Sequence, residues 1–325
     1  MTMAKKMLAL ALVLMMLCGG ALAEGVTVGV IQYATHPSLD NCYEGFVQGL
    51  AEGGYVEGDN LTIDFQNAMG DMANSDMQAK TMVSNGEDML VGIATPSAMS
   101  AYAATKDEGK PVVFVAVSDA VAAGIVKSNE EPGTNCTGVS DVLNLEEQVK
   151  MIRAFQPEAK KIGIIYTTSE PNSVSHLEKI KPIAEKYGFE IVAEGISSAA
   201  EVATAASSLI AKDVDCINNF TDNNVVDNLP MVLHATNEAG IPVFGSEVEQ
   251  VKNGCVASMG LEYFELGKQT GAMAAKILKG EAKASEMEYE TITDYSIYIN
   301  SKALEALSIE IPQDVKDGAV ETSEE

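Results

Sequence analysis

The chain has 325 residues, of which 47 are acidic and 21 are basic, and its formal net charge is -26. Nucleic-acid phosphates and anionic membrane surfaces bind basic proteins, so this charge argues against both as partners. A chain of this length exceeds the size at which a single hydrophobic core keeps growing, and two domains are therefore expected.

The first residues have the layout of an export signal. Two lysines precede an apolar run that ends at Leu17, and small residues surround Ala23. The run is shorter than the roughly 20 residues that span a bilayer. We expect residues 1–23 to be a signal peptide, and the mature protein to be exported, periplasmic or extracellular. An alternative is that a lipidated Cys18 anchors the protein to the membrane.

Four further cysteines are scattered through the chain without the close spacing of a zinc site. Two of them, Cys216 and Cys255, fall in apolar runs and are expected to pack as small core residues. The sequence does not determine whether Cys42 and Cys136 form disulfides with each other or with these two. It predicts no metal site and no cofactor.

The stretch Val26–Asp40 indicates the architecture. Its first six residues, Val26–Ile31, are typical of a short buried strand, and a polar loop follows. Apolar residues then recur at helical spacing until Gly53. A strand, a loop at its carboxyl end and a returning helix form one unit of a parallel α/β sheet, in which ligands bind at the carboxyl ends of the strands.

This unit recurs in two series along the chain. The first series of strands is expected at Val26–Ile31, Asn60–Phe65, Met89–Ala94, Val112–Val117 and Cys136–Val139. The second series is expected at Lys161–Tyr166, Phe189–Ala193, Cys216–Phe220, Ile241–Phe244 and Cys255–Met259, with a last strand at Asp294–Asn300. Each series contains a G-x-P-V segment before a buried strand. The sequence therefore predicts two similar α/β lobes that face each other across a cleft.

Several helix boundaries can also be predicted. Thr95 followed by Pro96 favours a helix start, with Thr95 as N-cap. Asn144 with a glutamate three residues later predicts a capping box, and Ser198 with Glu201 a second one. Pro182 and Pro230 lie inside predicted helices, which they should kink or split.

Enzyme motifs are absent from the sequence: it contains no G-x-S-x-G, P-loop, G-x-G-x-x-G or H-E-x-x-H. Of the three histidines, His176 and His234 are predicted to face solvent from helices. His36 lies in a cleft loop, but no nucleophile accompanies it. We therefore predict no catalytic residue.

Arg153 is the only arginine and is predicted to lie away from the strand ends. A ligand anion would have to bind a helix N-terminus, such as the turn at 95–97, rather than an arginine fork. Acidic residues at strand ends suit an ammonium group, although strand-end Ser, Thr, Asp and Asn also serve as ordinary N-caps. Aromatic residues occur near the same loops: Tyr33, Tyr102, Phe220 and Tyr263.

These residues resemble a known family, the exported substrate-binding proteins of ABC transporters typified by tryptophan- and tyrosine-binding components. The similar segments, in order, are GVIQYATHPSLDNCYEGFVQGL, IATPSA, VFVAVSDAVAAGIV, GVSD, IGIIYTTSEPNS, FTDNNVV, IPVFGSE and MGLEYFELGKQTGAMAAKILKG. Ala120 departs from the pattern, since a proline is common there, and the residues before Cys18 are a poor lipidation motif.

The resemblance implies a type I periplasmic binding protein with two Rossmann-like lobes and a multi-crossing hinge. The corresponding lobes are 24–141 plus 262–290, and 142–261 plus 291–320, with 321–325 a disordered tail. The candidate ligand contacts are Gln32, Tyr33, Thr95, Pro96, Ser97, Ser118, Asp119, Ser140, Asp141, Ser169, Glu170, Thr221, Asp222, Asn223, Glu247 and Tyr263.

The implied function is a non-enzymatic, monomeric receptor that binds a hydrophobic or aromatic amino acid (Trp, Tyr or Phe, or less favourably a branched-chain one) and delivers it to an ABC permease. The acidic strand-end residues suit the ammonium group, and replacing Asp222 by alanine is expected to weaken ammonium binding; these residues are Asp119, Asp141, Glu170, Asp222 and Glu247. One alternative is a sensor of the same fold for sugars or other small molecules. Another is a two-cysteine amino-acid racemase, for which Cys42 would be the better-placed thiol.

Overall fold

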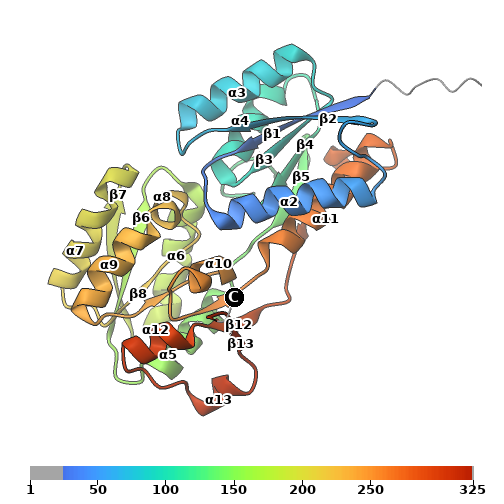
Figure 1. The fold of residues 1–325 in the computed structure, drawn as a ribbon. Helices are drawn as coiled ribbons and strands as arrows, with labels where there is room; N and C mark the ends of the chain where they lie inside the picture. The colour runs from blue at the N-terminus through green and yellow to red at the C-terminus, as the bar shows by residue number, and fades with distance from the viewer. Residues whose placement is uncertain (1–24, 324–325) are drawn as a thin grey trace, which may run out of the picture.

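The computed structural model describes residues 25–323 and shows two α/β lobes joined by several chain crossings (Figure 1). The predicted signal peptide and Cys18 lie outside the described residues. Within this range no helix is long and apolar enough to cross a membrane.

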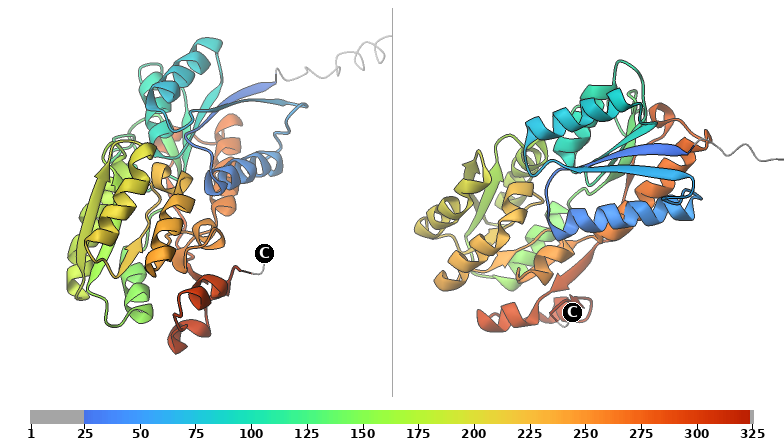
Figure 2. Two further views of the ribbon diagram at one scale, coloured as in Figure 1. Left: turned by 60° about the vertical axis from the view of Figure 1, so that its left-hand side comes forward. Right: turned by 45° about the horizontal axis from the view of Figure 1, so that its top comes forward.

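The first lobe is built on a six-stranded, fully parallel sheet with the order β11-β5-β4-β3-β1-β2. Its strands are β1 (Val26–Gln32), β2 (Leu61–Asn67), β3 (Met89–Ile93), β4 (Val112–Val115), β5 (Cys136–Ser140) and β11 (Glu290–Thr291). Helices α3 (Met72–Asn85) and α4 (Thr95–Thr105) cover one face, and α2 (Pro37–Glu52) and α11 (Tyr263–Leu278) the other (Figures 1 and 2). Both faces are covered, which explains why the strands are continuous apolar runs.

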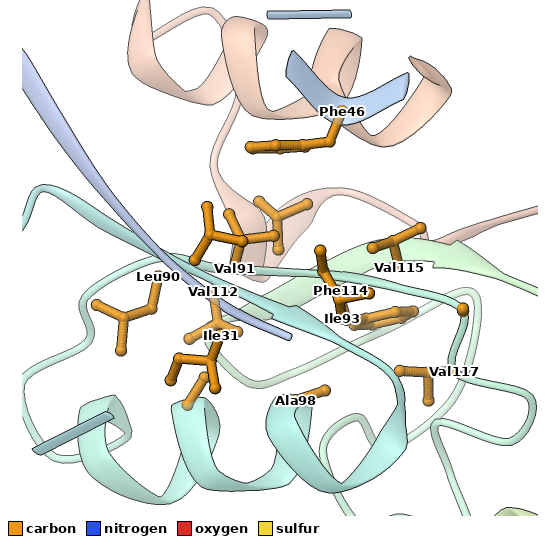
Figure 3. Packing of buried hydrophobic residues seen from close by; sticks show 14 of the residues in the cluster. Ile31, Phe46, Leu90, Val91, Ile93, Ala98, Val112, Phe114, Val115 and Val117 are labelled. Carbon is orange, nitrogen blue, oxygen red and sulfur yellow. The ribbon is translucent and has the colours of Figure 1, made fainter. Parts of the chain in front are cut away.

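The core of this lobe forms between the sheet and its helices (Figure 3). Phe46 of α2 points toward the sheet from one side, while Ala98 of α4 lies on the other. Phe46, Ile93 and Phe114 have no solvent-exposed surface. This rigid layer holds the carboxyl ends of the strands in fixed positions.

Helices α2 and α11 approach each other closely because glycines line their contact. A Cβ added to Gly45 would lie 2.0 Å from the Phe264 carbonyl oxygen, and one added to Gly267 would lie 2.0 Å from that of Cys42. No real Cβ contact is so short, so only glycine fits at these two positions. The contact fixes the start of α2, and with it one wall of the cleft.

The second lobe contains two smaller sheets. A parallel sheet has the order β7-β6-β8-β9, and a mixed sheet has the order β10-β12-β13; a single bridge between Gly245 and Ser258 joins them. The strands are β6 (Lys161–Thr167), β7 (Glu190–Ile196), β8 (Cys216–Asn218), β9 (Val243–Phe244), β10 (Ala257–Gly260), β12 (Ser296–Ile299) and β13 (Val320–Glu321).

The helices of this lobe begin at the carboxyl ends of strands or pack on the sheets. They are α5 (Leu145–Phe155), α6 (Pro171–Lys186), α7 (Val202–Ala211), α8 (Asn223–Asp227), α9 (Leu229–Ala239), α10 (Val248–Lys252), α12 (Ser301–Ala306) and α13 (Gln313–Lys316). Short 3-10 turns occur at η1 (Ala199–Glu201) and η2 (Ala284–Glu286). The two-lobed α/β class predicted from the sequence is confirmed.

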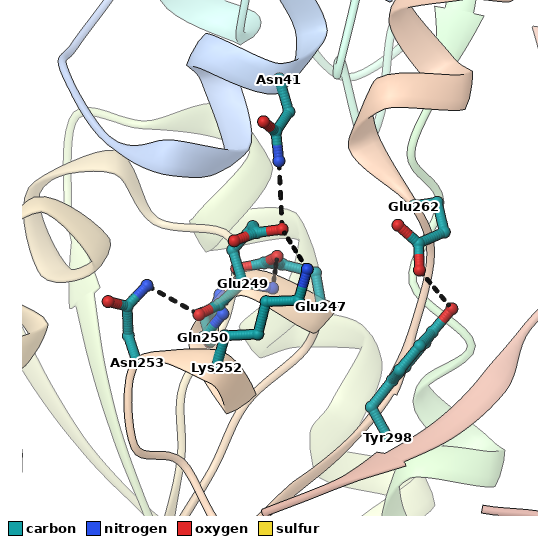
Figure 4. A network of polar contacts seen from close by, with 8 residues as sticks. All are labelled: Asn41, Glu247, Glu249, Gln250, Lys252, Asn253, Glu262 and Tyr298. Atoms are coloured by element: carbon teal, nitrogen blue, oxygen red, sulfur yellow. Dashed lines mark hydrogen bonds and ion pairs between the residues drawn. The ribbon is translucent and has the colours of Figure 1, made fainter. Parts of the chain in front are cut away.

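The chain passes between the lobes in three places: after β5, after β10 and after β11. Tyrosines connect these crossings, since the Tyr295 hydroxyl donates to the Val142 carbonyl at 2.6 Å and the Tyr298 hydroxyl donates to Glu262 at 3.0 Å (Figure 4). We propose lobe boundaries near residues 141, 261 and 290, as expected from the sequence. The predicted disordered tail needs one correction, because Glu321 belongs to β13, which pairs with β12.

Two helix predictions, for Thr95 and Ser198, also need correction, and one of the two outcomes predicted for Pro182 does not occur. Thr95 is not the N-cap of α4; Ala94 occupies that position and contributes no side-chain hydrogen bond. Pro182 does not split α6, which continues through it, whereas the second proline-containing segment is divided into α8 and α9 as expected. Ser198 makes no side-chain cap, while Asn144 accepts from the Glu147 backbone as predicted.

Candidate functional site: a cavity between the lobes

A cavity lies where the carboxyl ends of the strands of both lobes meet. In the first lobe Gln32, Ile93, Val115 and Val139 are aligned across neighbouring strands, so the loops that follow them form one row. The second lobe contributes the loops after β6, β8 and β9. The lining residues are His36, Ser38, Leu39, Ala94, Thr95, Ala116, Ser118, Asp141, Asn172, Thr221, Asn223, Val226, Glu247, Gln250 and Tyr263.

Two of these lining residues have an unusual backbone. Ala94 and Ala116 follow β3 and β4, and their φ angles are 75° and 56°. Non-glycine residues rarely adopt such angles, and when they do the conformation is often tied to a binding site. Here the two alanines also keep the cavity wall free of bulky side chains.

Asp141 is the open carboxylate of the cavity. Its Oδ2 accepts a 2.5 Å hydrogen bond from the Tyr263 hydroxyl, but its Oδ1 is buried and has no partner among the described residues. Burial raises the pKa of Asp141 to about 6, while the hydrogen bond from Tyr263 and the nearby hydroxyl of Ser118 act in the opposite direction. A buried carboxylate oxygen without a donor is unfavourable on its own, and a ligand ammonium group would satisfy it.

Two further buried carboxyl groups lie at the cavity or beside it. Burial raises the pKa of Glu247 and of Glu170 to about 8, and the negative charge of Asp222 adds to the effect at Glu170. Glu247 accepts from the backbone N–H groups of Glu249 and Gln250, at 2.6 and 2.9 Å, and so caps α10. Both glutamates therefore bind a proton more readily than an exposed glutamate does.

Asp222, whose substitution is predicted to weaken ammonium binding, lies outside the cavity lining. Its two oxygens accept from the backbone N–H and hydroxyl of Thr167, the hydroxyl of Ser173 and the backbone N–H of Val225, at 2.6 to 3.1 Å. Asp222 is fully buried, does not line the cavity and caps α8. Of Asp141 and Asp222, only Asp141 lines the cavity.

Asp119 lies at the interface between the lobes, outside the cavity. It accepts from the Lys179 ammonium group at 2.6 Å and from the Ser175 hydroxyl at 2.7 Å, both on α6 of the second lobe. At another edge of the interface between the lobes, Asn41 of α2 donates to Glu249 of α10 at 3.0 Å (Figure 4). These bonds can form only when the lobes are close together.

The structure brings together seven of the sixteen predicted contacts: Thr95, Ser118, Asp141, Thr221, Asn223, Glu247 and Tyr263. The other nine do not line the cavity. Some form hydrogen bonds elsewhere: Tyr33 donates to the Gly70 carbonyl, and Ser140 to that of Val117. Ser169 is exposed. The complete set outside the cavity is Gln32, Tyr33, Pro96, Ser97, Asp119, Ser140, Ser169, Glu170 and Asp222.

The sequence prediction missed eight lining residues: His36, Ser38, Leu39, Ala94, Ala116, Asn172, Val226 and Gln250. His36 was interpreted as a loop residue, but it is buried in the cavity wall. His176 was expected to face solvent, yet it is buried against Phe220. The third histidine, His234, is exposed as predicted.

The thiol groups of the four cysteines and the guanidinium group of Arg153 lie outside the cavity lining. All four cysteines of the described chain are free and buried, and burial raises the pKa of Cys42 well above its ordinary value. Such a thiol cannot act as the base of a racemase. The Arg153 guanidinium group donates to the backbone carbonyls of Pro157 and Tyr187, and Arg153 does not line the cavity. Within residues 25–323, no cluster of side chains suits a metal ion.

Taken together, the fold and the cavity define a two-lobed solute-binding protein of the type I periplasmic class. Residues 27–323 match the model of the family described as ABC transporter substrate binding protein. The chain belongs to this family, whose members and solved relatives are solute-binding proteins rather than enzymes.

Two relatives are informative. A tyrosine-binding protein of Clostridioides difficile is 40% identical over 283 residues, which cover 87% of this chain and 81% of that protein. A Streptococcus pneumoniae ABC domain was solved in complex with L-Trp and is 36% identical to this chain. The two structures superpose with a TM-score of 0.88 over 91% of this chain and 99% of that one.

A third relative indicates the arrangement of the lobes. The ligand-free, open structure of a Clostridium difficile substrate-binding protein is 40% identical over 91% of this chain and 99% of that one, yet its TM-score is only 0.68. The described chain thus superposes better on the tryptophan complex than on an open relative of higher identity. The hydrogen bonds of Asp119 and Asn41 across the cleft agree with a closed arrangement.

Proposed function

We propose that this protein is the extracytoplasmic receptor of an ABC importer and that it binds an aromatic amino acid, Trp, Tyr or Phe, between its lobes. The observation that carries the proposal is the unpartnered oxygen of Asp141, in a cavity whose described lining contains no lysine or arginine. Such a cavity favours a ligand with one positive group. The names of the tyrosine-binding relative and the tryptophan complex support an aromatic one.

The lining offers a partner for each part of such a ligand. The ammonium group would bind the open oxygen of Asp141. The carboxylate would approach the first turn of α4 at Thr95, where Ala94 provides no side-chain cap and backbone N–H groups favour an anion. The apolar side chains of Leu39 and Val226, which belong to opposite lobes, would contact the ring.

Because contacts from both lobes exist only when the cleft is closed, ligand binding would favour the closed form. A permease in the membrane would then distinguish the loaded receptor from the empty one.

We propose that the receptor acts as a monomer after export. The mass of the mature protein distinguishes the two ways in which the signal peptide could be processed. Cleavage after Ala23 leaves Glu24 as the first residue, whereas a protein lipidated at Cys18 would begin at Cys18 and carry added acyl mass.

The ligand assignment is tested by thermal unfolding of protein purified without added amino acids, after dialysis from partial denaturant to remove any bound ligand. L-Tyr, L-Trp and L-Phe should raise the melting temperature at millimolar concentration, while a decarboxylated analogue such as tyramine should raise it much less. If sugars raise the melting temperature and none of the aromatic amino acids does, the proposal is wrong and the sugar-sensor alternative holds.

A further inference from the structure

His36 is the one histidine in the cavity wall, and nothing in the proposed contacts uses it. It lies between β1 and α2, at the N-cap position of α2, yet its side chain makes no capping hydrogen bond. The residue is only 7% exposed, and neither ring nitrogen has a hydrogen-bond partner among the described residues. His36 lines both the cavity and an adjoining hollow.

The His36 ring is neutral at physiological pH. Burial lowers its pKa to about 4, although the neighbouring Asn223 and Asp40 side chains act in the opposite direction. A neutral imidazole carries one N–H donor and one nitrogen acceptor. Burying such groups without partners is unfavourable, so a ligand that supplies a polar partner at this position would be favoured.

The strand order places His36 and Asp141 at opposite ends of the cavity. Asp141 follows β5, His36 follows β1, and β4 and β3 lie between them. Three strand spacings, about 14 Å, separate the ends of β1 and β5. An amino acid held at Asp141 by its ammonium group would therefore extend its side chain toward His36, with Leu39 and Val226 beside the ring.

We propose that His36 hydrogen-bonds a polar atom at the tip of the ligand's aromatic side chain, either a phenol hydroxyl or an indole N–H. This assignment rests on the proposed function, because it takes the bound ammonium group as its reference point. It makes His36 a specificity-determining residue: tyrosine and tryptophan satisfy the ring, whereas the bare phenyl ring of phenylalanine leaves a buried polar group unpaired.

The experiment is isothermal titration of the ligand-free protein with L-Tyr, L-Trp and L-Phe. We expect at least one of the two polar-tipped ligands to bind about tenfold or more tightly than L-Phe, since one lost buried hydrogen bond costs about 1.5 kcal/mol. In His36→Leu this ratio should fall below about threefold, mainly through weaker binding of the polar-tipped ligand. His36→Gln, which restores a donor and an acceptor, should recover part of the ratio.

The exposed His234 provides a matched control, and His234→Leu should keep the wild-type ratio. Because the readout is a ratio between ligands, a general loss of stability in His36→Leu does not mimic the effect, and the wild-type ratio tests the inference even if that variant does not fold. Equal wild-type affinity for all three ligands, or a ratio that survives in His36→Leu, would overturn the role of His36 while leaving the receptor intact. Failure of all three to bind wild-type protein would overturn the proposed function as well.

Discussion

Asp141 and Asp222 show how two identical residues in equivalent places can differ in role. Each follows a buried strand within a short polar pair, Ser140-Asp141 or Thr221-Asp222, and each is almost fully buried. Asp222 accepts four hydrogen bonds from its own lobe, whereas Asp141 accepts one from Tyr263 and keeps an oxygen without a partner among the described residues. A carboxylate whose acceptor capacity is satisfied stabilises the fold, while an unsatisfied one is available to a ligand.

The largest expected effect is on the stability of Asp222→Ala. The substitution leaves the buried donors of Thr167, Ser173 and Val225 without their acceptor, so we expect the free energy of unfolding to fall by about 3 kcal/mol. Urea unfolding of the ligand-free protein measures this loss of stability. The exposed Asp227, also on α8, is the matched control, and Asp227→Ala should change stability little. Equal stability of both variants would contradict the capping role.

For Asp141→Asn we expect the opposite result, a loss of ligand affinity without a loss of stability. An asparagine keeps the size of the side chain and can still accept from Tyr263, but it removes the charge that would bind an ammonium group. Affinity for the preferred amino acid should fall about 100-fold, the value of a charge-assisted hydrogen bond of roughly 3 kcal/mol. Stability should not fall, because burial already disfavours the ionised form of Asp141. An unchanged dissociation constant would remove Asp141 from the site.

The raised pKa of Glu247 predicts a pH dependence of stability. Its folded-state pKa of about 8 lies above that of the unfolded chain, so the folded protein binds the extra proton and loses stability as the pH rises toward 8. Unfolding measured at pH 6.5, 7.25 and 8 should show this decline, with at most about 1.4 kcal/mol per pH unit from this one group. Glu247→Gln should make the profile flatter; a profile of the same slope in the variant would argue against this origin.

The smallest effect is expected for Asp119→Asn, which removes the ion pair across the cleft. Lys179 is more than half exposed, and such pairs contribute about 0.2–1 kcal/mol. The closed form should be weakened by no more than about fivefold, seen as a modest loss of ligand affinity and a larger radius of gyration without ligand. Lys179→Met should have a similar effect, and the double variant should add little to either. A loss as large as that of Asp141→Asn would make Asp119 a ligand contact after all.

Much of the fold could be predicted because its signals are local. Buried strands such as Met89–Ile93 are continuous apolar runs, and parallel sheets place their carboxyl ends at one edge. The chain length and the two series of strands predicted two lobes, and the family resemblance added the multi-crossing hinge. Helix starts were less reliable: Thr95 with Pro96 matches a capping pattern, yet the helix begins one residue earlier because Ala94 adopts a positive φ that its sequence does not indicate.

The site could be predicted only as a neighbourhood. Strand-end loops contain more polar residues than one cavity can use, and capping residues have the same identities as binding residues. His176 illustrates the opposite error, since a polar residue on a helix was assigned to solvent although Phe220 covers it in the second lobe. Burial of a helix face depends on partners that are distant in the sequence.

The sequence by itself determined the parallel α/β class, the polar strand ends and an acidic chain whose single arginine lies away from those strand ends. Only the tertiary structure decided which strand-end groups remain open. The reason is that the hydrogen-bonding capacity of a side chain is used up by neighbours from other segments: Thr167 and Ser173 satisfy Asp222, whereas the groups around Asp141 and His36 leave polar atoms unpaired inside the cavity.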